Sequence, residues 1–114
     1  MDRVSLYRKS IQKILTEYYE ISAQTPEPDG MESVLAFDEQ RDHYFWLQIG
    51  WDEDGRVRAI TVYIRIKDEK IHIEQDLTEE GMAKELLRFG VLPEDIVLAF
   101  QPPEMRKYTD FALV

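Results

Sequence analysis

Hydrophobic and polar residues alternate through the middle of the chain, from about residue 33 to residue 76. β-branched and aromatic residues dominate four stretches of this region, and short runs of turn-forming residues separate them. Joints of hairpin length connect neighbouring strands in antiparallel order. We therefore predict a four-stranded antiparallel meander with strands at about 34–37, 43–51, 56–66 and 70–75.

The third stretch has the most regular alternation, which predicts a half-buried strand. Its apolar set is expected on one side of the sheet, with Ile60, Val62, Ile64 and Ile66. The opposite side is expected to carry Ala59, Thr61, Tyr63, Arg65 and Lys67.

The second stretch is apolar on both of its faces. Its alternating sets are Phe45, Leu47 and Ile49 on one face, and Tyr44 and Trp46 on the other. Such a strand is either covered on both sides or in contact with another subunit. Because two helices cover only part of a twisted sheet, we predict a homodimer. Its interface is expected to contain Tyr44, Trp46 and Tyr63.

Apolar residues recur every three or four positions at the start of the chain, which predicts a helix over residues 2–22. A second helix is predicted over 78–89, where Gly90 supplies a left-handed stop. A short added strand is predicted at 96–100, followed by a C-terminal helical turn near Pro103. With the meander between the helices, these elements predict a single α+β domain over residues 1–114.

Composition narrows the class of protein. The chain has 114 residues, a net charge of −9 and no cysteine, so disulfides and thiolate sites are excluded. No apolar run approaches the ~20 residues that a membrane span needs. Because phosphate binding depends on Lys and Arg, this charge disfavours direct binding of nucleic acid. We expect a cytoplasmic protein without a membrane segment.

Few residues could carry catalysis, and no cofactor is expected. The sequence contains no glycine-rich phosphate loop, zinc-protease helix motif or nucleophile elbow. His43 and His72 alternate with apolar residues, so we expect them to face solvent or a hydrogen-bond partner rather than a metal. Pro28-Asp29 and Asp68-Glu69-Lys70 resemble the acid and lysine signature of metal-dependent nucleases. The second piece falls in a predicted hairpin turn, which argues against a nuclease site.

Four cations make the first half of the N-terminal helix basic, namely Arg3, Arg8, Lys9 and Lys13. A charge run of this kind is usually a solvated helix face. The other interpretation is a small docking patch for an acidic partner.

Ordered blocks along nearly the whole chain resemble one family. The late blocks are Asp76…Thr78-Glu79…Gly81…Ala83…Glu85-Leu86, then residues 95–100, then Pro102-Pro103-Glu104…Arg106…Tyr108-Thr109…Phe111-Ala112. Earlier blocks include Phe37-Asp38, His43-Tyr44 and Gly50-Trp51. On these residues the chain resembles the XisI-like family, named for the fdxN element excision controlling factor of filamentous cyanobacteria. Gln101 departs from the family pattern, in which this position often carries histidine.

The resemblance implies a small α+β protein that acts as an accessory in the programmed excision of a DNA element. In that system a separate recombinase cuts the strands, and the XisI-like protein works beside a second controlling factor, XisH. XisH-like proteins themselves resemble endonuclease folds. No catalytic residues are assigned to the XisI-like side. The resemblance therefore implies a non-enzymatic protein whose partner is XisH-like.

The closing segment, residues 102–111, is the candidate for partner binding. The residues proposed to make this contact are Pro102, Pro103, Glu104, Arg106, Tyr108 and Phe111. Prolines pre-set the backbone of a recognition surface, and Arg and Tyr dominate binding hot spots. In that case, replacing Arg106 and Tyr108 together by alanine should weaken binding at least tenfold, about 1.4 kcal/mol, with little change in melting temperature. The alternative is a structural seal, with Arg106 paired to an acid and Phe111 buried.

Two other functions stay open on the sequence alone. One is a small-ligand binder or an enzyme with a pocket between the sheet and the closing segment. The other is weak direct binding of DNA through the four cations of the first helix.

Overall fold

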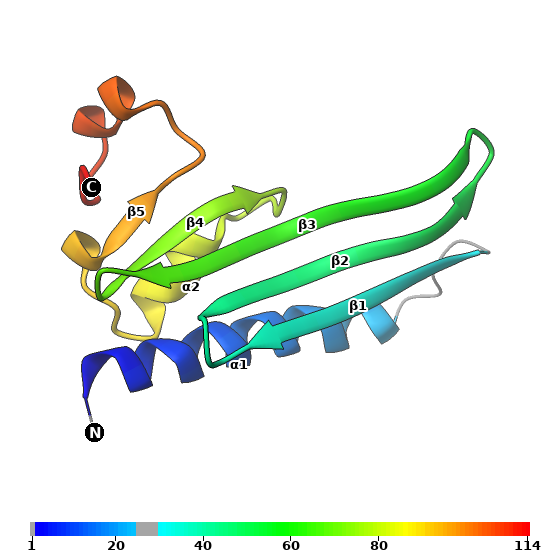
Figure 1. The fold of residues 1–114 in the computed structure, drawn as a ribbon, viewed down its shortest axis with the longest axis horizontal. Helices are drawn as coiled ribbons and strands as arrows, with labels where there is room; N and C mark the ends of the chain where they lie inside the picture. The colour runs from blue at the N-terminus through cyan, green and yellow to red at the C-terminus, as the bar shows by residue number, and fades with distance from the viewer. Residues whose placement is uncertain (1, 25–29) are drawn as a thin grey trace.

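In the computed structural model, which describes residues 2–24 and 30–114, two α-helices pack on the same face of one sheet (Figure 1). The helices are α1 (Arg3–Gln24) and α2 (Met82–Arg88). The strands are β1 (Met31–Asp38), β2 (His43–Asp52), β3 (Gly55–Lys67), β4 (Lys70–Asp76) and β5 (Ile96–Leu98). Two short 3-10 helices, η1 (Pro93–Asp95) and η2 (Pro103–Tyr108), stand before and after β5. The predicted α+β order of elements is confirmed.

The four-stranded meander is antiparallel throughout, as the alternation predicts. Tight hairpins join its strands. Asp68 and Glu69 both have positive φ, of 53° and 63°, which is the backbone that a two-residue hairpin between right-twisted strands requires. The carboxylate of Asp38 accepts hydrogen bonds from the backbone N–H groups of Gln40 and Arg41, and these bonds close the turn between β1 and β2.

A β-bulge at Thr61 reverses the alternation of side chains between the two faces of the sheet at this point of β3. Trp46 pairs with Val62, yet the next residue, Leu47, pairs with Ile60, so Thr61 is left between the two pairs. Ile60 therefore shares a face with Leu47, whereas Val62 and Ile64 lie with Trp46. The prediction that Ile60 lies on the side of Val62 is wrong, because unbroken alternation in sequence does not reveal an extra residue in the ladder.

The second helix is shorter than predicted because Asp76 organises the residues before it. One carboxylate oxygen of Asp76 accepts from the Thr78 backbone N–H at 2.9 Å and the Thr78 hydroxyl at 2.5 Å. The other accepts from the Met82 N–H at 2.6 Å, which lies in the first turn of α2. Gly81 precedes the helix with φ of 88°, so residues 77–81 form a loop and the helix begins at Met82.

The added strand makes the sheet mixed. β5 runs parallel to β4, with Ile71 paired to Ile96 and Ile73 to Leu98, whereas β1 to β4 are antiparallel. A parallel pair needs a crossover connection, and α2 supplies it on the same face as α1 (Figure 1). The core fills the space between this sheet face and the helices, with Ile11, Ile14, Leu15, Tyr44, Val62, Ile64, Ile71, Ile73, Met82 and Leu86. No helix in the described ranges is long and apolar enough to cross a membrane.

Candidate functional site

The face of the sheet opposite the helices is apolar and no helix of the described residues covers it (Figure 1). By strand register this open face carries Phe45, Leu47, Ile49, Ile60 and Tyr63, all of them half-buried. Phe45 and Tyr63 stack across two strands, with ring centroids 4.3 Å apart and planes 10° from parallel. A contiguous apolar face of this kind marks a contact surface.

The structure does not bring together the three residues predicted for the dimer interface. Tyr44 is fully buried and Trp46 is only 8% exposed, because both lie on the face that α1 covers. The ring of Trp46 packs against Tyr18 of α1, with centroids 6.0 Å apart. Tyr63 lies on the open face instead. The prediction that Tyr44, Trp46 and Tyr63 share one surface is therefore wrong. β2 is apolar on both faces, but one face packs against the helices and the other is left uncovered by them.

Both histidines lie on the open face, in register with Arg65 of the strand between them. His43 Nδ1 lies 2.7 Å from the Tyr63 hydroxyl, and Arg65 donates to the carboxylate of Glu74 at 2.8 Å. Burial is the main cause that lowers the pKa of His72 below its ordinary value. Within the described residues, neither histidine belongs to a group of three or more side chains that could hold a metal ion.

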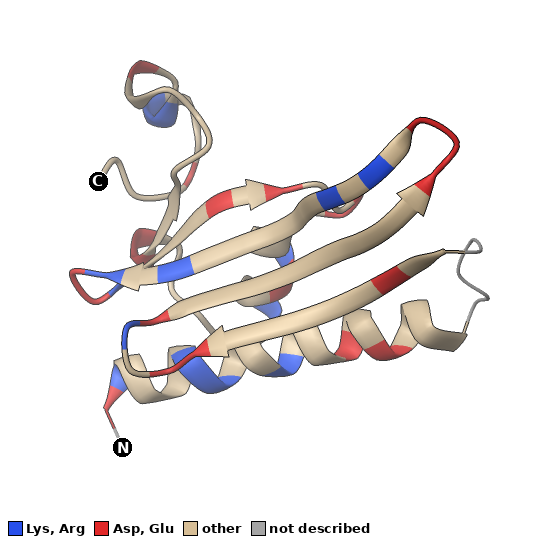
Figure 2. Cartoon of the chain, turned by 45° about the vertical axis from the view of Figure 1, so that its right-hand side comes forward, with Lys and Arg blue, Asp and Glu red and all other residues tan. Residues whose placement is uncertain are grey.

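Charged residues of both signs lie at the end of the sheet that carries the β2–β3 hairpin (Figure 2), and an exposed indole lies there as well. Trp51 is 60% exposed, and the guanidinium of Arg56 lies over its ring, 5.4 Å from the centroid. The acidic hairpin residues 52–54 follow directly, and all three are exposed. This end of the open face presents an aromatic ring and a cation to solvent.

The closing segment is held down by two of the residues proposed for partner binding. Arg106 donates to three backbone carbonyls, those of Gln101 at 3.2 Å, Leu113 at 3.2 Å and Ala99 at 3.4 Å. Phe111 packs against the core. Both side chains thus fix the segment to the sheet edge, and Arg106 does so through carbonyls, not through the acid that the structural alternative assumed.

The other four predicted residues of the segment are exposed: Pro102, Pro103, Glu104 and Tyr108. Tyr108 is 73% exposed, and the ammonium of Lys107 lies 5.2 Å from its ring centroid. Exposed apolar side chains surround it in sequence, namely Phe100, Met105, Leu113 and Val114. The segment therefore has an inner side that fixes it to the sheet edge and an exposed outer side.

Arg3, Arg8 and Lys13, all cations of α1, have contacts within the molecule. Arg8 makes a two-pronged contact with Asp42, at 2.7 and 3.0 Å, and this pairing lowers the pKa of the Asp42 carboxyl. Arg3 lies 3.4 Å from the buried carboxylate of Asp95. Lys13 lies over the ring of Phe89. These contacts leave the helix poorly suited to bind phosphates.

The structure describes only the second piece of the nuclease-like signature. Pro28-Asp29 lies outside the described residues. Asp68 and Glu69 form the hairpin between β3 and β4, as expected, and Glu69 lies 3.9 Å from Arg3. Lys70 donates to the backbone carbonyl of Val114 at 2.6 Å.

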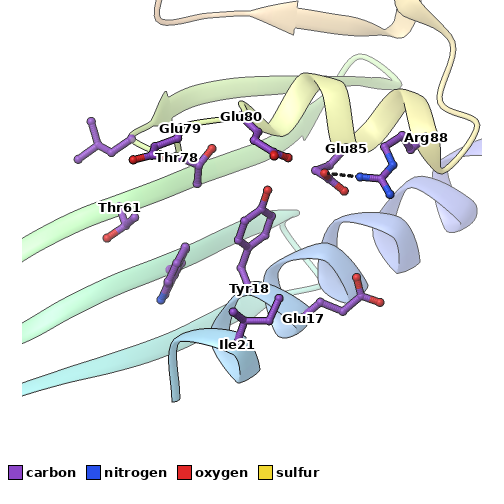
Figure 3. A pocket seen from close by; sticks show the side chains of 11 residues that line it. Glu17, Tyr18, Ile21, Thr61, Thr78, Glu79, Glu80, Glu85 and Arg88 are labelled. Carbon is purple, nitrogen blue, oxygen red and sulfur yellow. Dashed lines mark hydrogen bonds and ion pairs between the residues drawn. The ribbon is translucent and has the colours of Figure 1, made fainter. Parts of the chain in front are cut away.

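A cavity of about 590 Å³ opens on the helix side of the sheet, between α1 and the start of α2 (Figure 3). It is lined by Glu17, Tyr18, Ile21, Trp46, Thr61, Leu77, Thr78, Glu79, Glu80, Glu85 and Arg88. The alternative of a ligand binder or an enzyme has its pocket between the sheet and the closing segment, but no residue of that segment lines this cavity. No sequence motif signals it, because its walls come from two helices, two strands and a loop that meet only in the folded chain.

Negative charge converges on the aromatic ring at the centre of the cavity wall. Figure 3 shows the Tyr18 hydroxyl pointing toward Glu80, with Glu85 beyond it. The pKa of Tyr18 is raised, first by burial and then by the charges of Glu85, Glu80 and Asp76. Glu85 is paired with Arg88, whose Nη1 donates to it at 2.9 Å.

Comparison with known proteins gives a family. The model of the XisI protein family matches residues 1–113. The crystal structure of fdxN element excision controlling factor XisI from Anabaena variabilis is 41% identical, with a TM-score of 0.88, over 99% of this chain and 100% of that one. A XisI-like protein from the same organism is 35% identical, with a TM-score of 0.87, over 97% and 99% of the two chains. No curated protein matches the chain significantly. The chain belongs to the XisI family.

Proposed function

We propose that this chain is a controlling factor for the excision of a DNA element. One observation carries the proposal: over 99% of its length, the chain is 41% identical to an Anabaena protein described as an fdxN element excision controlling factor, with a TM-score of 0.88. This likeness extends over nearly the whole length of both chains. We place this role in the cytoplasm of a bacterium, where the DNA element would lie.

In this proposal the chain acts by binding an XisH-like protein and not by catalysis. Its net charge of −9 favours a basic protein partner over DNA. The cations of α1 whose contacts are described above are engaged inside the molecule, which weakens the case for phosphate binding. Exposed aromatic and apolar side chains on the open face and the closing segment supply contact area.

Two surfaces serve two different contacts. The outer side of the closing segment, with Pro102, Pro103, Glu104 and Tyr108, is proposed to meet the partner, while Arg106 and Phe111 hold that surface in place. The open face of the sheet is proposed to pair with a second copy of the chain. In a two-fold interface the same surface of each copy meets, and the apolar side chains of the open face can pack against the same side chains of a second copy.

An excision assay tests the function. A DNA element with its flanking recombination sites is placed in a host with the recombinase and the XisH-like protein, with or without this chain, and the excision junction is quantified. Excision is expected to depend on this chain and to fall at least several-fold with Tyr108→Ala. Glu53→Gln, an exposed change on the β2–β3 hairpin, serves as the control. Equal excision without the chain would refute the proposal.

A further inference from the structure

The cavity between α1 and α2 has an aromatic wall of the kind that attracts cations. Tyr18 and Trp46 both line it, and their ring planes are tilted by 33°. Aromatic faces attract a guanidinium or an ammonium through the ring quadrupole, and Trp is the strongest in this respect. The large apolar side chains Ile21 and Leu77 line the same cavity and are 63% and 67% exposed. They can pack against the methylene stem of a long basic side chain.

Carboxylates without internal partners surround this wall. Glu17, Glu79 and Glu80 line the cavity, and none of them has a hydrogen bond or ion pair with another described residue. Arg88 shows how a guanidinium fits here, since it donates to the fourth carboxylate, that of Glu85, at 2.9 Å. Burial raises the pKa of Tyr18 first, and the charges of Glu85, Glu80 and Asp76 raise it further. One internal cation faces four acids, so the cavity is left with unbalanced negative charge.

The wall also contains a buried donor without a partner. The Trp46 side chain is 8% exposed, and its Nε1–H makes no hydrogen bond within the described part of the chain. An unpaired buried donor is rare and costs about 1–3 kcal/mol. A cationic group cannot satisfy it, because guanidinium and ammonium groups only donate. A peptide brings carbonyl oxygens as well as cations. A carbonyl accepts from this indole only if the wall opens, since the Nε1 atom has less than 1 Å² of exposed surface.

We propose that this cavity binds an arginine side chain presented by a protein partner, with the guanidinium between the Tyr18–Trp46 wall and the carboxylates of Glu79 and Glu80. The assignment rests on the proposed function only in taking the partner to be a protein. Arginine fits better than lysine, because its planar group stacks on rings and engages carboxylates in pairs. A metal ion does not fit, since no group of three acids or histidines in the described residues comes close enough to hold one.

Nuclear magnetic resonance of the ¹⁵N-labelled full chain tests the site. The probe is blocked arginine, N-acetyl-arginine-methylamide, and the matched control is blocked citrulline, which has the same shape without the charge. A saturable shift of the Trp46 indole N–H signal is expected with arginine and an affinity at least about fivefold weaker with citrulline. The Trp51 indole, on the open face, is the internal control and should not move. Equal shifts with both probes, movement of both indoles, or no saturable shift would overturn the assignment.

Charge-neutral variants locate the binding. Glu79→Gln with Glu80→Gln keeps size and hydrogen bonding, and both positions are exposed, so the fold should be unaffected. Arginine affinity is expected to fall at least about fivefold in this variant and to stay unchanged in the Glu53→Gln control. Unchanged affinity in the double variant would contradict the site. Spermidine, which has no acceptor, should bind more weakly than blocked arginine; tighter binding would assign the cavity to a free polycation instead.

A binding titration with the XisH-like protein separates this inference from the proposed function. The double variant is expected to bind that protein about tenfold more weakly than the unmodified chain does. If the XisH-like protein binds both equally, the cavity is not where the partner docks, and the inference fails while the proposed function stands. If it does not bind the unmodified chain but blocked arginine does bind, the proposed function fails and the arginine site stands.

Discussion

At the scale of single residues, side chains fix the position of chain segments by satisfying backbone groups. Arg106 is the clearest case, because its guanidinium reaches three carbonyls that no strand ladder or helix pairs. Tyr108, two residues on, is 73% exposed, and the ammonium of its neighbour Lys107 lies 5.2 Å from its ring centroid. The two residues have therefore separate roles, although the sequence groups them in one binding surface.

Replacing these two residues one at a time separates the roles. Arg106→Ala leaves carbonyls without donors, so the free energy of unfolding is expected to fall by about 1–3 kcal/mol. Tyr108→Ala is expected to change it by less than about 0.5 kcal/mol, since the side chain is exposed. Urea denaturation of the two variants measures this. Equal stability of the two variants would mean that Arg106 does not hold the segment. It would also support the expectation from the sequence that replacing both residues by alanine leaves the melting temperature nearly unchanged.

His72 makes stability depend on pH. Its pKa is lowered in the folded protein, chiefly by burial and with Arg65 nearby, although the charge of Glu74 opposes the shift. The unfolded chain therefore takes up a proton first as the pH falls below about 6.5, and the folded state loses stability there. Above that pH this contribution is fully present. His72→Gln is expected to flatten the loss between pH 7 and pH 5, measured by urea denaturation at each pH. Parallel pH curves for the two proteins would contradict this.

At the scale of elements, close backbone contacts fix the register of β1 against β2. A Cβ at Gly50 would lie 1.9 Å from the carbonyl oxygen of Gly30. The pairing of β1 with β2 begins next to this contact, at Met31 and Gly50, so the backbone cannot easily move apart. No side chain fits there. The same Gly30 carbonyl accepts from the N–H of Trp51 at 2.9 Å, so the contact cannot open without loss of a hydrogen bond.

Gly50→Ala is expected to lower the free energy of unfolding by at least about 1–3 kcal/mol, because the added methyl overpacks the strand pair. Gly55→Ala is the matched control: that glycine also has positive φ, of 128°, but open space around it. The difference between the two variants isolates the clash from backbone strain. A Gly50→Ala variant no less stable than Gly55→Ala would refute the contact.

The elements could be predicted from the sequence where one local pattern decides them. Period-two alternation and hairpin residues give the meander, and the three- and four-residue repeat gives α1 to within two residues. The start of α2 could not be found, because the Asp76 carboxylate binds Thr78 and Met82 at the same time in a loop. The bulge at Thr61 and the parallel direction of β5 depend on pairing partners, which local patterns do not specify.

The candidate sites divide in the same way. The closing segment could be singled out because prolines, arginine and tyrosine recur in it. Its inner and outer sides could not be told apart, since carbonyl positions decide the role of Arg106. The face of Tyr44 and Trp46 could not be chosen either, because β2 is apolar on both sides. The acidic cavity could not be predicted from the sequence, because the glutamates that line it lie on separate elements of the fold.

At the scale of the whole molecule, one face of the sheet has helices and the other has none (Figure 1). We predict that the open face pairs two copies, so light scattering at micromolar concentration should give twice the chain mass of 13.5 kDa. Tyr63→Ala and Trp51→Ala should weaken the dimer, whereas Trp46→Ala should mainly destabilise the fold, since Trp46 lies under α1. An interface that contains Trp46, as predicted from the sequence, would instead make Trp46→Ala weaken the dimer. A monomer mass throughout that range would contradict the dimer.

The central claim is that this XisI-family chain works by binding an XisH-like protein. Isothermal titration of the two purified proteins tests it most directly, with Tyr108→Ala to probe the closing segment and Glu53→Gln as control. We predict a saturable complex with a dissociation constant of about 1 μM or tighter, weakened at least about tenfold by Tyr108→Ala and unchanged by Glu53→Gln. No saturable heat at protein concentrations well above this range would contradict the account.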